Sequence, residues 1–239
     1  MRITGRIIAT ATIAALNTGI YVQAACPCVT VESFEDLKAT IESSDDALIR
    51  LCPFSVTKEN NELGIKITKG VHIMCAKESR EDVCEINGTG VSGSNQSKRY
   101  EVIHATGVDN VWIQGLTFRH AKKGAIRVQG DNFKIIDSVF ENCQSPPNSS
   151  GAVVEIMEGS TATVIDSTFT SNEGGAIQNN GFLTVTHCDF IDNASTPLWI
   201  SNDETESRGG GVVSPFTVIS KIFQDIGTLA LHQKFGQLS

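Results

Sequence analysis

The sequence predicts an all-β solenoid, in which short strands stack coil upon coil around one continuous apolar core. The main observation is a series of phenylalanines with steps of 22, 29, 21 and 33 residues: Phe118, Phe140, Phe169, Phe190 and Phe223. An apolar residue stands five positions before each of them: Ile113, Ile135, Val164, Val185 and Val218. A short apolar segment follows each of them: Gly124–Ile126, Gly151–Val153, Gly175–Ile177, Thr196–Leu198 and Gly227–Leu229. This spacing, lengthened twice by insertions, is typical of repeats that bury their apolar faces only by stacking.

The N-terminal residues have the pattern of a secretory signal peptide. Arg2 and Arg6 precede the apolar run Ile7–Leu16, and Val22–Ala24 fits a small-residue cleavage site. The run is shorter than the roughly 20 residues that span a membrane. We therefore expect residues 1–24 to be a signal peptide, with no membrane span after its cleavage, and the protein to be secreted or at the cell surface. A buried N-terminal strand is the alternative.

The charge balance is acidic. The whole chain has a net charge of −8, and removal of Arg2 and Arg6 takes Lys and Arg from 19 to 17 against 27 Asp and Glu, a net charge of −10. Because nucleic-acid backbones are bound by clustered Lys and Arg, a nucleic acid is not an expected partner. The sequence also predicts no cofactor, and no Cys or His spacing resembles a zinc site.

All seven cysteines follow the predicted cleavage site, in an oxidising context where disulfides persist. Cys75 and Cys84 close a short polar loop and are the best candidate pair. Either Cys26 or Cys28 could reach Cys52, and the sequence does not choose between them.

Cys143 and Cys188 are a different case. They lie two coils apart at different points of the repeat. Two coils correspond to a separation of roughly 9–10 Å, which is beyond the reach of a disulfide. We expect both to be buried free thiols.

Four sequons for N-glycosylation follow the signal segment, at Asn87, Asn95, Asn148 and Asn193. Asn95 and Asn148 lie in polar, loop-like stretches, which favours them as acceptors in a eukaryote. Asn193 occupies a repeat position and ranks lowest, because its side chain could be buried there.

Residues 25–46 are expected to form an N-terminal segment that contains a capping helix. Ser33 and Asp36 form a weak capping box. Three apolar residues share one face of the helix: Phe34, Leu37 and Ile41. A helix over Ser33–Ile41 would cover the open end of the solenoid, where core and strand edges are otherwise exposed.

The solenoid domain is expected to span residues 47–239. Apolar alternation predicts early strands at Ala47–Cys52, Ile65–Ile67, Val71–Ile73 and Cys84–Ile86, and Tyr100–His104 opens the regular coils. Polar segments predict surface loops at Gly88–Lys98, Gln144–Ser150 and Ser201–Gly211.

Three positions of the repeat have restricted residue types. Three residues before Phe stand types that tolerate the left-handed backbone of a corner: Gly115, Asp137, Asp166 and His187. Two residues before Phe stand mostly small residues, as an inward stack requires: Leu116, Ser138, Ser167 and Cys188. Three residues after Phe stand Ala121, Cys143, Asn172 and Asn193. We expect Asn172 and Asn193 to form a ladder of amide hydrogen bonds.

The repeat resembles known families. Phe169-Thr170-Ser171-Asn172 followed by Gly174-Gly175-Ala176-Ile177 resembles the FxxN and GGAI signature of polymorphic outer-membrane protein repeats. From about Ala47 to Leu231 the coils look like those of the pectin-lyase-like superfamily. The N-terminal part is similar to secreted diatom β-helix proteins in the following residues: Phe34–Lys38, Leu51–Phe54, Ile67–Gly70, Cys75 and Cys84.

The superfamily resemblance implies a right-handed parallel β-helix, here with a short N-terminal capping helix. Members of the superfamily include polysaccharide lyases, glycosidases, epimerases and adhesins, so the fold alone does not decide the function. The paired-aspartate and Gly-His-Gly elements of the polygalacturonases have no match in this sequence. The calcium-binding aspartates and the arginine motif of the pectate lyases have none either.

The column of Asp137, Asp166 and His187 is one candidate site. Neighbouring coils would hold these side chains about 5 Å apart, close enough to bind calcium or to perform acid–base chemistry. Gly115 fills the same column, however, and a need for left-handed backbone explains all four residue types. We therefore favour the structural explanation over a metal site.

The outer side of the Gly-Ala-Ile strand is a second candidate site. Arg127 points outward because its neighbours point inward, and the same count places Gln178 and Trp199 in one column with it. Glu155 joins this column if the insertion before Gly151 shifts its strand by one residue. The resemblance implies that this sheet lines a polysaccharide groove.

These residue types suit a glycan site. An exposed Trp stacks on a sugar ring, and Arg binds carboxylated sugars through two hydrogen bonds. A scattered polar surface with one exposed aromatic residue is the alternative.

The sequence therefore predicts a secreted or cell-surface protein without catalytic activity. Its role would be structural, adhesive or polysaccharide-binding, and its partner an extracellular polysaccharide or a cell-surface protein. The alternative is a lyase or glycoside hydrolase that acts on acidic polysaccharide, which requires a base or two carboxylates in ordered placement.

The C-terminal residues begin one more coil. Val218 and Phe223 keep the five-residue spacing, Gly227–Leu231 supplies the following strand, and the chain ends at Ser239 without a capping element. Either a partner or a second copy covers this end, or the chain is a truncated version of a longer protein, which we favour. We therefore expect the last coil to be incomplete and the isolated chain to self-associate or to be poorly soluble.

Overall fold

The computed structural model describes residues 28–58, 63–79, 81–88, 101–122, 124–144, 152–173 and 175–193, together with the backbone of residues 198–200 and 217–219. Several sequence predictions fall outside these residues: the signal peptide, Cys26, Asn95, Asn148, Phe223, Gly227–Leu231 and the C-terminal end.

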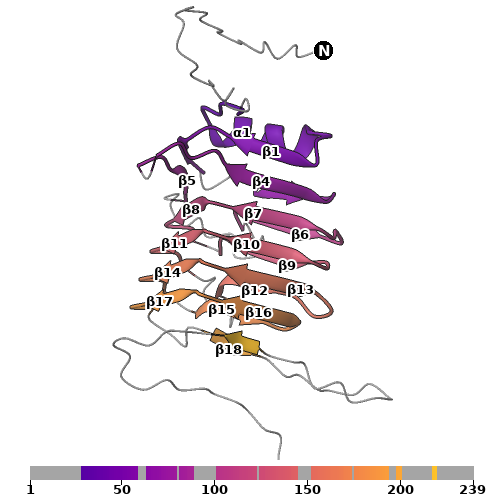
Figure 1. Cartoon of the computed structure of the whole chain (residues 1–239), viewed down its shortest axis with the longest axis vertical. Helices are drawn as coiled ribbons and strands as arrows, with labels where there is room; N and C mark the ends of the chain where they lie inside the picture. The colour runs from indigo at the N-terminus through magenta and orange to yellow at the C-terminus, as the bar shows by residue number, and fades with distance from the viewer. Residues whose placement is uncertain are drawn as a thin grey trace, which may run out of the picture.

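Three parallel sheets form the faces of a solenoid, and Figure 1 shows its coils stacked along the long axis. Sheet A contains β1 (Leu48–Leu51), β4 (Val71–Cys75), β7 (Val111–Gln114), β10 (Phe133–Ile136), β13 (Thr161–Ile165), β16 (Phe182–Thr186) and β19 (Thr217–Ile219). Sheet B contains β2 (Phe54–Thr57), β5 (Cys84–Asn87), β8 (Leu116–Arg119), β11 (Val139–Glu141), β14 (Thr168–Thr170) and β17 (Asp189–Ile191). Sheet C contains β3 (Ile65–Ile67), β6 (Ile103–Thr106), β9 (Ile126–Gln129), β12 (Ala152–Ile156), β15 (Gly175–Asn179) and β18 (Leu198–Ile200).

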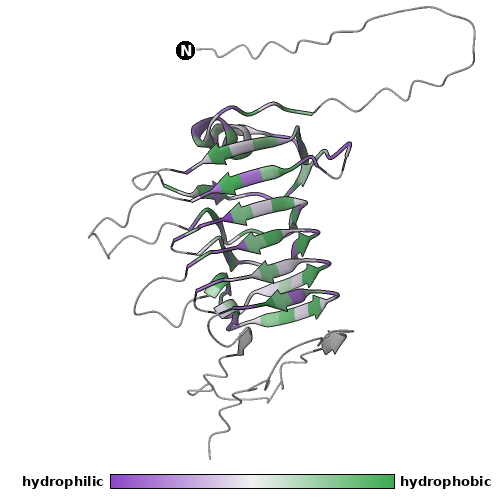
Figure 2. Cartoon of the chain, turned by 90° about the vertical axis from the view of Figure 1, so that its left-hand side faces the viewer, coloured by the Kyte–Doolittle hydropathy of each residue, from purple (hydrophilic) through white to green (hydrophobic). Residues whose placement is uncertain are grey.

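Each coil contributes one strand to sheet A, then one to sheet B, then one to sheet C. The strands are short because each coil turns a corner after a few residues. Within each strand, side chains alternate between the core and the outside. In β4, for example, Val71, Ile73 and Cys75 are buried while His72 and Met74 between them are partly exposed. Figure 2 shows the same alternation of hydrophobic and hydrophilic residues along the strands. The predicted all-β solenoid of parallel strands is confirmed.

The corner between sheets A and B is a single left-handed residue. The backbone φ is 74° at Gly115, 49° at Asp137, 50° at Asp166 and 52° at His187. Their amides extend the hydrogen-bonded ladder, since the Asp137 N–H donates to the Ile165 carbonyl at 3.1 Å. The predicted need for a left-handed backbone at this column is confirmed.

A second left-handed column follows sheet B. Its φ values lie between 49° and 53° at His120, Asn142, Ser171 and Asp192. The sequence analysis did not identify this column, in which only Ser171 is of a type that rarely adopts positive φ. The first corner turns the chain from sheet A to sheet B, and the second turns it from sheet B toward sheet C.

The phenylalanines form one stack inside the solenoid. Neighbouring ring centroids are 5.1 Å apart for Phe118 and Phe140, 4.6 Å for Phe140 and Phe169, and 5.1 Å for Phe169 and Phe190. The rings are parallel within 8°. The stack is buried, except that its last described member, Phe190, is only partly buried. The reason is its strand, since β17 ends the described part of sheet B.

The small-residue column before the phenylalanines also lies inside the solenoid, as predicted. Its members are all about 1% exposed: Leu116, Ser138, Ser167 and Cys188. The Ser167 hydroxyl accepts from the Ser138 N–H at 3.2 Å and donates to the Ile165 carbonyl at 2.8 Å. The hydroxyls therefore satisfy backbone groups inside the core.

The predicted asparagine ladder is present at the turn from sheet B to sheet C. The Asn172 Nδ2 donates to Asn193 Oδ1 at 2.8 Å and to the Phe140 carbonyl at 3.1 Å. The Asn193 Nδ2 donates to the Phe169 carbonyl at 3.0 Å. A glycan on Asn193 would replace a donor of this ladder, which supports its low rank among the sequons.

The N-terminal end is covered by α1 (Phe34–Ser43), as predicted and as Figure 1 shows. The Ser33 hydroxyl accepts from the Asp36 N–H at 3.1 Å and caps the helix. The apolar face is buried through Phe34, Leu37 and Ile41. The helix therefore shields the core of the first coil from water.

The disulfides fix the first two coils. Cys75 is bonded to Cys84, as predicted, and Cys28 is bonded to Cys52, which resolves the choice that the sequence left open. Cys143 and Cys188 are buried free thiols, also as predicted.

Two predicted boundaries are wrong. The regular coils begin at Leu48 and not at Tyr100, because the Phe column continues toward the N-terminus as Ile86 and Val56, which carry no Phe signal. The strand after the first insertion is also shifted by one residue, since Ala152 rather than Gly151 pairs with Gly175.

Candidate functional site

One outer column of sheet C carries polar residues on successive coils; we call it the sheet C column. Its described members are paired in register, coil after coil: Lys66, His104, Arg127, Glu155 and Gln178. The backbone of Trp199 continues the column beside Gln178. The predicted alignment of Arg127, Gln178 and Trp199 is therefore confirmed. Glu155 joins them because the one-residue shift on which its place depended is present.

Arg127 lies between two carboxylates. Its Nη1 is 3.6 Å from Glu101 Oε1, and its Nε is 3.6 Å from Glu155 Oε2. The side chain of Arg127 is only 16% exposed, that of Glu101 7% and that of Glu155 18%. Charged groups this buried are normally paired, so the guanidinium charge is already compensated before any ligand arrives.

The sequence analysis did not identify Glu101. It lies outside the column, two residues before β6, and follows a stretch without periodicity. Its position depends on glycine, because a Cβ at Gly64 would overlap the Glu101 carbonyl oxygen. An isolated Glu in front of a strand gave no signal of a site.

His104 stands one coil before Arg127 in the same column. Burial lowers the pKa of its imidazole below the usual value; the Glu101 carboxylate opposes this shift, while Arg127 and Lys66 add to it. The imidazole is therefore held mainly neutral near pH 7, in which form it can accept a proton.

Gln178 is buried, and its Nε2 donates to Asn180 Oδ1 at 3.5 Å. It is a hydrogen-bonding group in a confined position rather than a freely exposed one. Trp199 is described only through its backbone, and its role in sugar stacking stays a prediction.

The column of Asp137, Asp166 and His187 is placed on the exposed corner between sheets A and B. Its residues form separate surface pairs, Asp137 with Lys77 at 3.3 Å and Asp166 with His187 at 3.4 Å. Within the described residues, no three His, Cys, Asp or Glu side chains come together as a metal site would require. The backbone geometry accounts for the residue types of this column.

The cluster around Arg127 combines groups that serve both binding and catalysis. Glu101 and Glu155 can accept hydrogen bonds from sugar hydroxyls, and His104 can exchange a proton. Arg127 is less suited to grip a carboxylated sugar, because a bidentate bond would have to compete with two carboxylates that already face it.

Comparison with known proteins agrees with the fold. Residues 101–214 match the family model described as a right-handed β-helix region. A crystal structure of a candidate glycosyl hydrolase from Parabacteroides merdae is similar over 72% of this chain and 90% of that chain, with 12% sequence identity and a TM-score of 0.44. No curated protein sequence matches the chain. No helix within the described ranges is long and apolar enough to cross a membrane. With its three parallel sheets and its match to the right-handed β-helix model, the chain is a right-handed parallel β-helix.

Proposed function

We propose that this protein is exported and binds polysaccharide, without cleaving it, along the outer face of sheet C. The observation that supports this most directly is the sheet C column, in which polar side chains are aligned on consecutive strands from Lys66 to Gln178. Strand spacing repeats these groups at intervals of about 4.8 Å. A polymer with a regular repeat can thus meet a hydrogen-bonding group at each step along the solenoid.

The charges of the cluster favour a neutral glycan. Glu101 and Glu155 bring two negative charges to the single positive charge of Arg127. An approaching uronate carboxylate would be repelled by Glu101 and Glu155, and its bond to Arg127 would have to displace an existing ion pair. A neutral sugar offers hydroxyl groups that donate hydrogen bonds to carboxylate oxygens. This binding involves no repulsion between like charges.

Export is supported by the disulfides and by the N-terminal sequence. Cys28–Cys52 and Cys75–Cys84 are of a kind that persists in oxidising compartments. We propose cleavage of residues 1–24 as a signal peptide, a capping segment over residues 25–46 and a solenoid over residues 47–239. Asn95 and Asn148 are the proposed glycan acceptors, whereas Asn87 lies half-buried in β5 and Asn193 belongs to the ladder.

A polysaccharide-cleaving enzyme is the second candidate function. The observation in its favour is the grouping of Glu101, Glu155 and His104 around Arg127, because hydrolysis of a glycosidic bond uses two carboxyl groups. We rank it second because both carboxylates are engaged in ion pairs, and because the catalytic motifs of the lyases and polygalacturonases are missing from the sequence.

The test is a glycan array of neutral and uronate polysaccharides, read in parallel with assays for unsaturated products and new reducing ends. Neutral glycans should bind, and no product should form. Glu155→Gln should weaken binding several-fold, because it removes a charged acceptor and unbalances Arg127.

The matched control is Glu141→Gln. Glu141 pairs with Arg119 at 2.8 Å on the outer face of sheet B, an equivalent ion pair outside the proposed site. Binding that is equally sensitive to both variants would contradict the proposed location. A preference for uronates, or product formation that Glu155→Gln abolishes, would favour the enzyme.

A further inference from the structure

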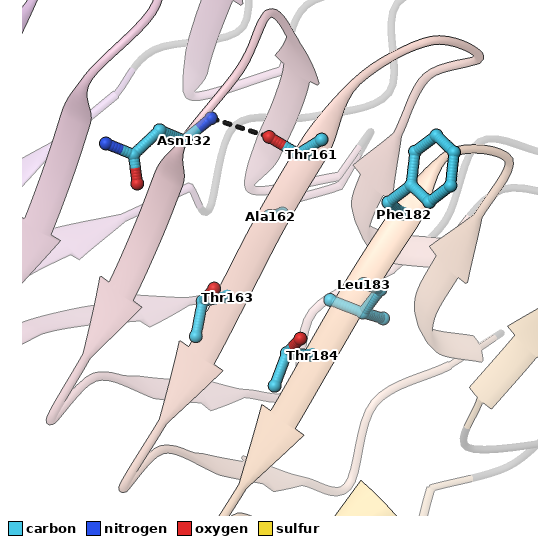
Figure 3. Close-up of a pocket in the computed structure, with 7 residues that line it drawn as sticks. All are labelled: Asn132, Thr161, Ala162, Thr163, Phe182, Leu183 and Thr184. Carbon is cyan, nitrogen blue, oxygen red and sulfur yellow. Dashed lines mark hydrogen bonds between the residues drawn. The ribbon is translucent and has the colours of Figure 1, made fainter. Parts of the chain in front are cut away.

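A hollow of about 240 Å³ lies on the outer face of sheet A, away from sheet C. We call it the sheet A hollow. It is shown in Figure 3 and is lined by Asn132, Thr161, Ala162, Thr163, Phe182, Leu183 and Thr184. It is smaller than the roughly 300–1,000 Å³ of a typical small-molecule pocket, which suits one unit of a larger ligand.

The hollow follows from the register of three strands. Phe133 pairs with Ala162, and Ala162 pairs with Leu183, so these residues turn inward. Two outer columns border their backbone, with Asn132, Thr161 and Phe182 on one side and Thr163 and Thr184 on the other. Threonines are short, so the sheet surface stays open between the columns, while Phe182 rises beside them (Figure 3).

The walls of the hollow are uncharged but rich in hydrogen-bonding groups. The Thr161 hydroxyl accepts from the Asn132 N–H at 2.7 Å, which leaves its own hydrogen to donate. The Asn132 Nδ2 donates to Asn110 Oδ1 at 2.6 Å, so the Asn132 Oδ1 can face a ligand as an acceptor. Phe182 adds an aromatic ring, and the residue is 40% exposed.

Among the described residues, the cation beside the hollow is directed elsewhere. Lys134 occupies the same outer column as Thr163, one coil earlier. Its Nζ lies 4.1 Å from the centre of the Trp112 ring on the preceding coil, and His72 packs edge-on to the same ring at 5.2 Å. The Lys134 charge is thus held over Trp112 by a cation–π contact, and the hollow is left neutral.

We propose that the sheet A hollow is a subsite for one neutral sugar residue, which stacks on Phe182 and hydrogen-bonds to Thr161, Thr163 and Thr184. An aromatic face beside several hydroxyl and amide groups, without charge, matches a ring that is apolar on its faces and hydroxylated at its edge. This inference rests on the proposed function for its polymer, and it adds a second contact surface on a different sheet.

The test uses the mature chain and neutral hexasaccharides of glucan, xylan and mannan as probes in calorimetric titrations. Phe182→Ala should weaken binding about 5- to 150-fold, the factor that corresponds to stacking energies measured for base–aromatic pairs. Phe182→Tyr should keep the affinity, and Thr163→Val, which removes one hydroxyl at constant shape, should lower it several-fold. Ile191→Ala is the control, since Ile191 is a similarly exposed apolar residue, 47% exposed, on sheet B.

The outcomes distinguish failure of this inference from failure of the proposed function. Loss of affinity in Phe182→Ala and Thr163→Val, with Phe182→Tyr and Ile191→Ala unaffected, supports the subsite. Wild-type affinity in Phe182→Ala and Thr163→Val, together with loss in Glu155→Gln, overturns the subsite and leaves the sheet C site standing. A wild-type protein that binds none of the three hexasaccharides overturns both. Circular dichroism of each variant confirms that the affinities compare folded proteins.

Discussion

Replacement of Phe169 by alanine is the sharpest test of the core. Phe169 is fully buried, and its ring lies between two others, 4.6 Å from Phe140 and 5.1 Å from Phe190. Truncation of a core Phe to Ala costs about 3–5 kcal/mol. Each stacked pair adds about 0.5–1.5 kcal/mol beyond burial. Because Phe169 loses two such pairs, the cost should lie in the upper half of that range, about 4–5 kcal/mol.

Phe190 provides the matched control within the same stack. It is partly buried and has a single described ring partner, Phe169. Phe190→Ala should therefore cost clearly less than Phe169→Ala, about 1–3 kcal/mol. The two variants differ in depth within the stack but not in chemistry.

The assay is equilibrium unfolding in urea with the disulfides intact, followed by both circular dichroism and tryptophan fluorescence. Coincident transitions justify a two-state free energy, which matters because solenoids can unfold coil by coil. A loss below about 1 kcal/mol for Phe169→Ala, or a loss no larger than that of Phe190→Ala, would refute the stacked core.

Three further predictions concern the thiols, a histidine and the predicted stacking residue. Cys143 and Cys188 should resist alkylation in the native protein and react after unfolding, because burial raises the pKa of both thiols, for Cys143 to about 12; rapid native labelling would show that they are exposed. The melting temperature should fall as the pH drops below about 6.5, since burial lowers the pKa of His104 and the unfolded chain binds the proton more readily; His104→Asn should flatten this slope, and an unchanged slope in that variant would exclude this histidine as its source. Trp199→Ala should weaken glycan binding by about 1–3 kcal/mol, by analogy with base–aromatic stacking, and unchanged titration curves would remove Trp199 from the site.

The fold was predictable because it repeats. Five Phe residues with an apolar partner five positions earlier specify two strands and a corner, and the left-handed types at Asp137 and Asp166 mark that corner. The first two coils were harder to recognise as regular, since Val56 and Ile86 hold the Phe position there and the loop closed by Cys75 and Cys84 lengthens the second coil. An aliphatic side chain fills the same space but gives no distinctive spacing in the sequence.

The candidate site was predictable only in part. Alternation along a strand placed Arg127 and Gln178 on the outer side, because that rule depends on sequence spacing alone. The ion pair with Glu101 was not predictable, since it depends on how the chain approaches β6 past Gly64 rather than on any period. The sequence suggested that Arg127 binds carboxylated sugars, whereas in the structure Glu101 and Glu155 already neutralise its charge. This difference depends on three-dimensional packing, which the sequence pattern does not contain.

A crystal structure of the mature protein with the tightest-binding neutral oligosaccharide would test the central claim most directly. We predict an intact sugar chain along the outer face of sheet C, with hydroxyl groups within hydrogen-bonding distance of Glu155 and Gln178. A ligand bound to another face with sheet C empty, or a chain cleaved beside Glu101 and Glu155, would contradict it.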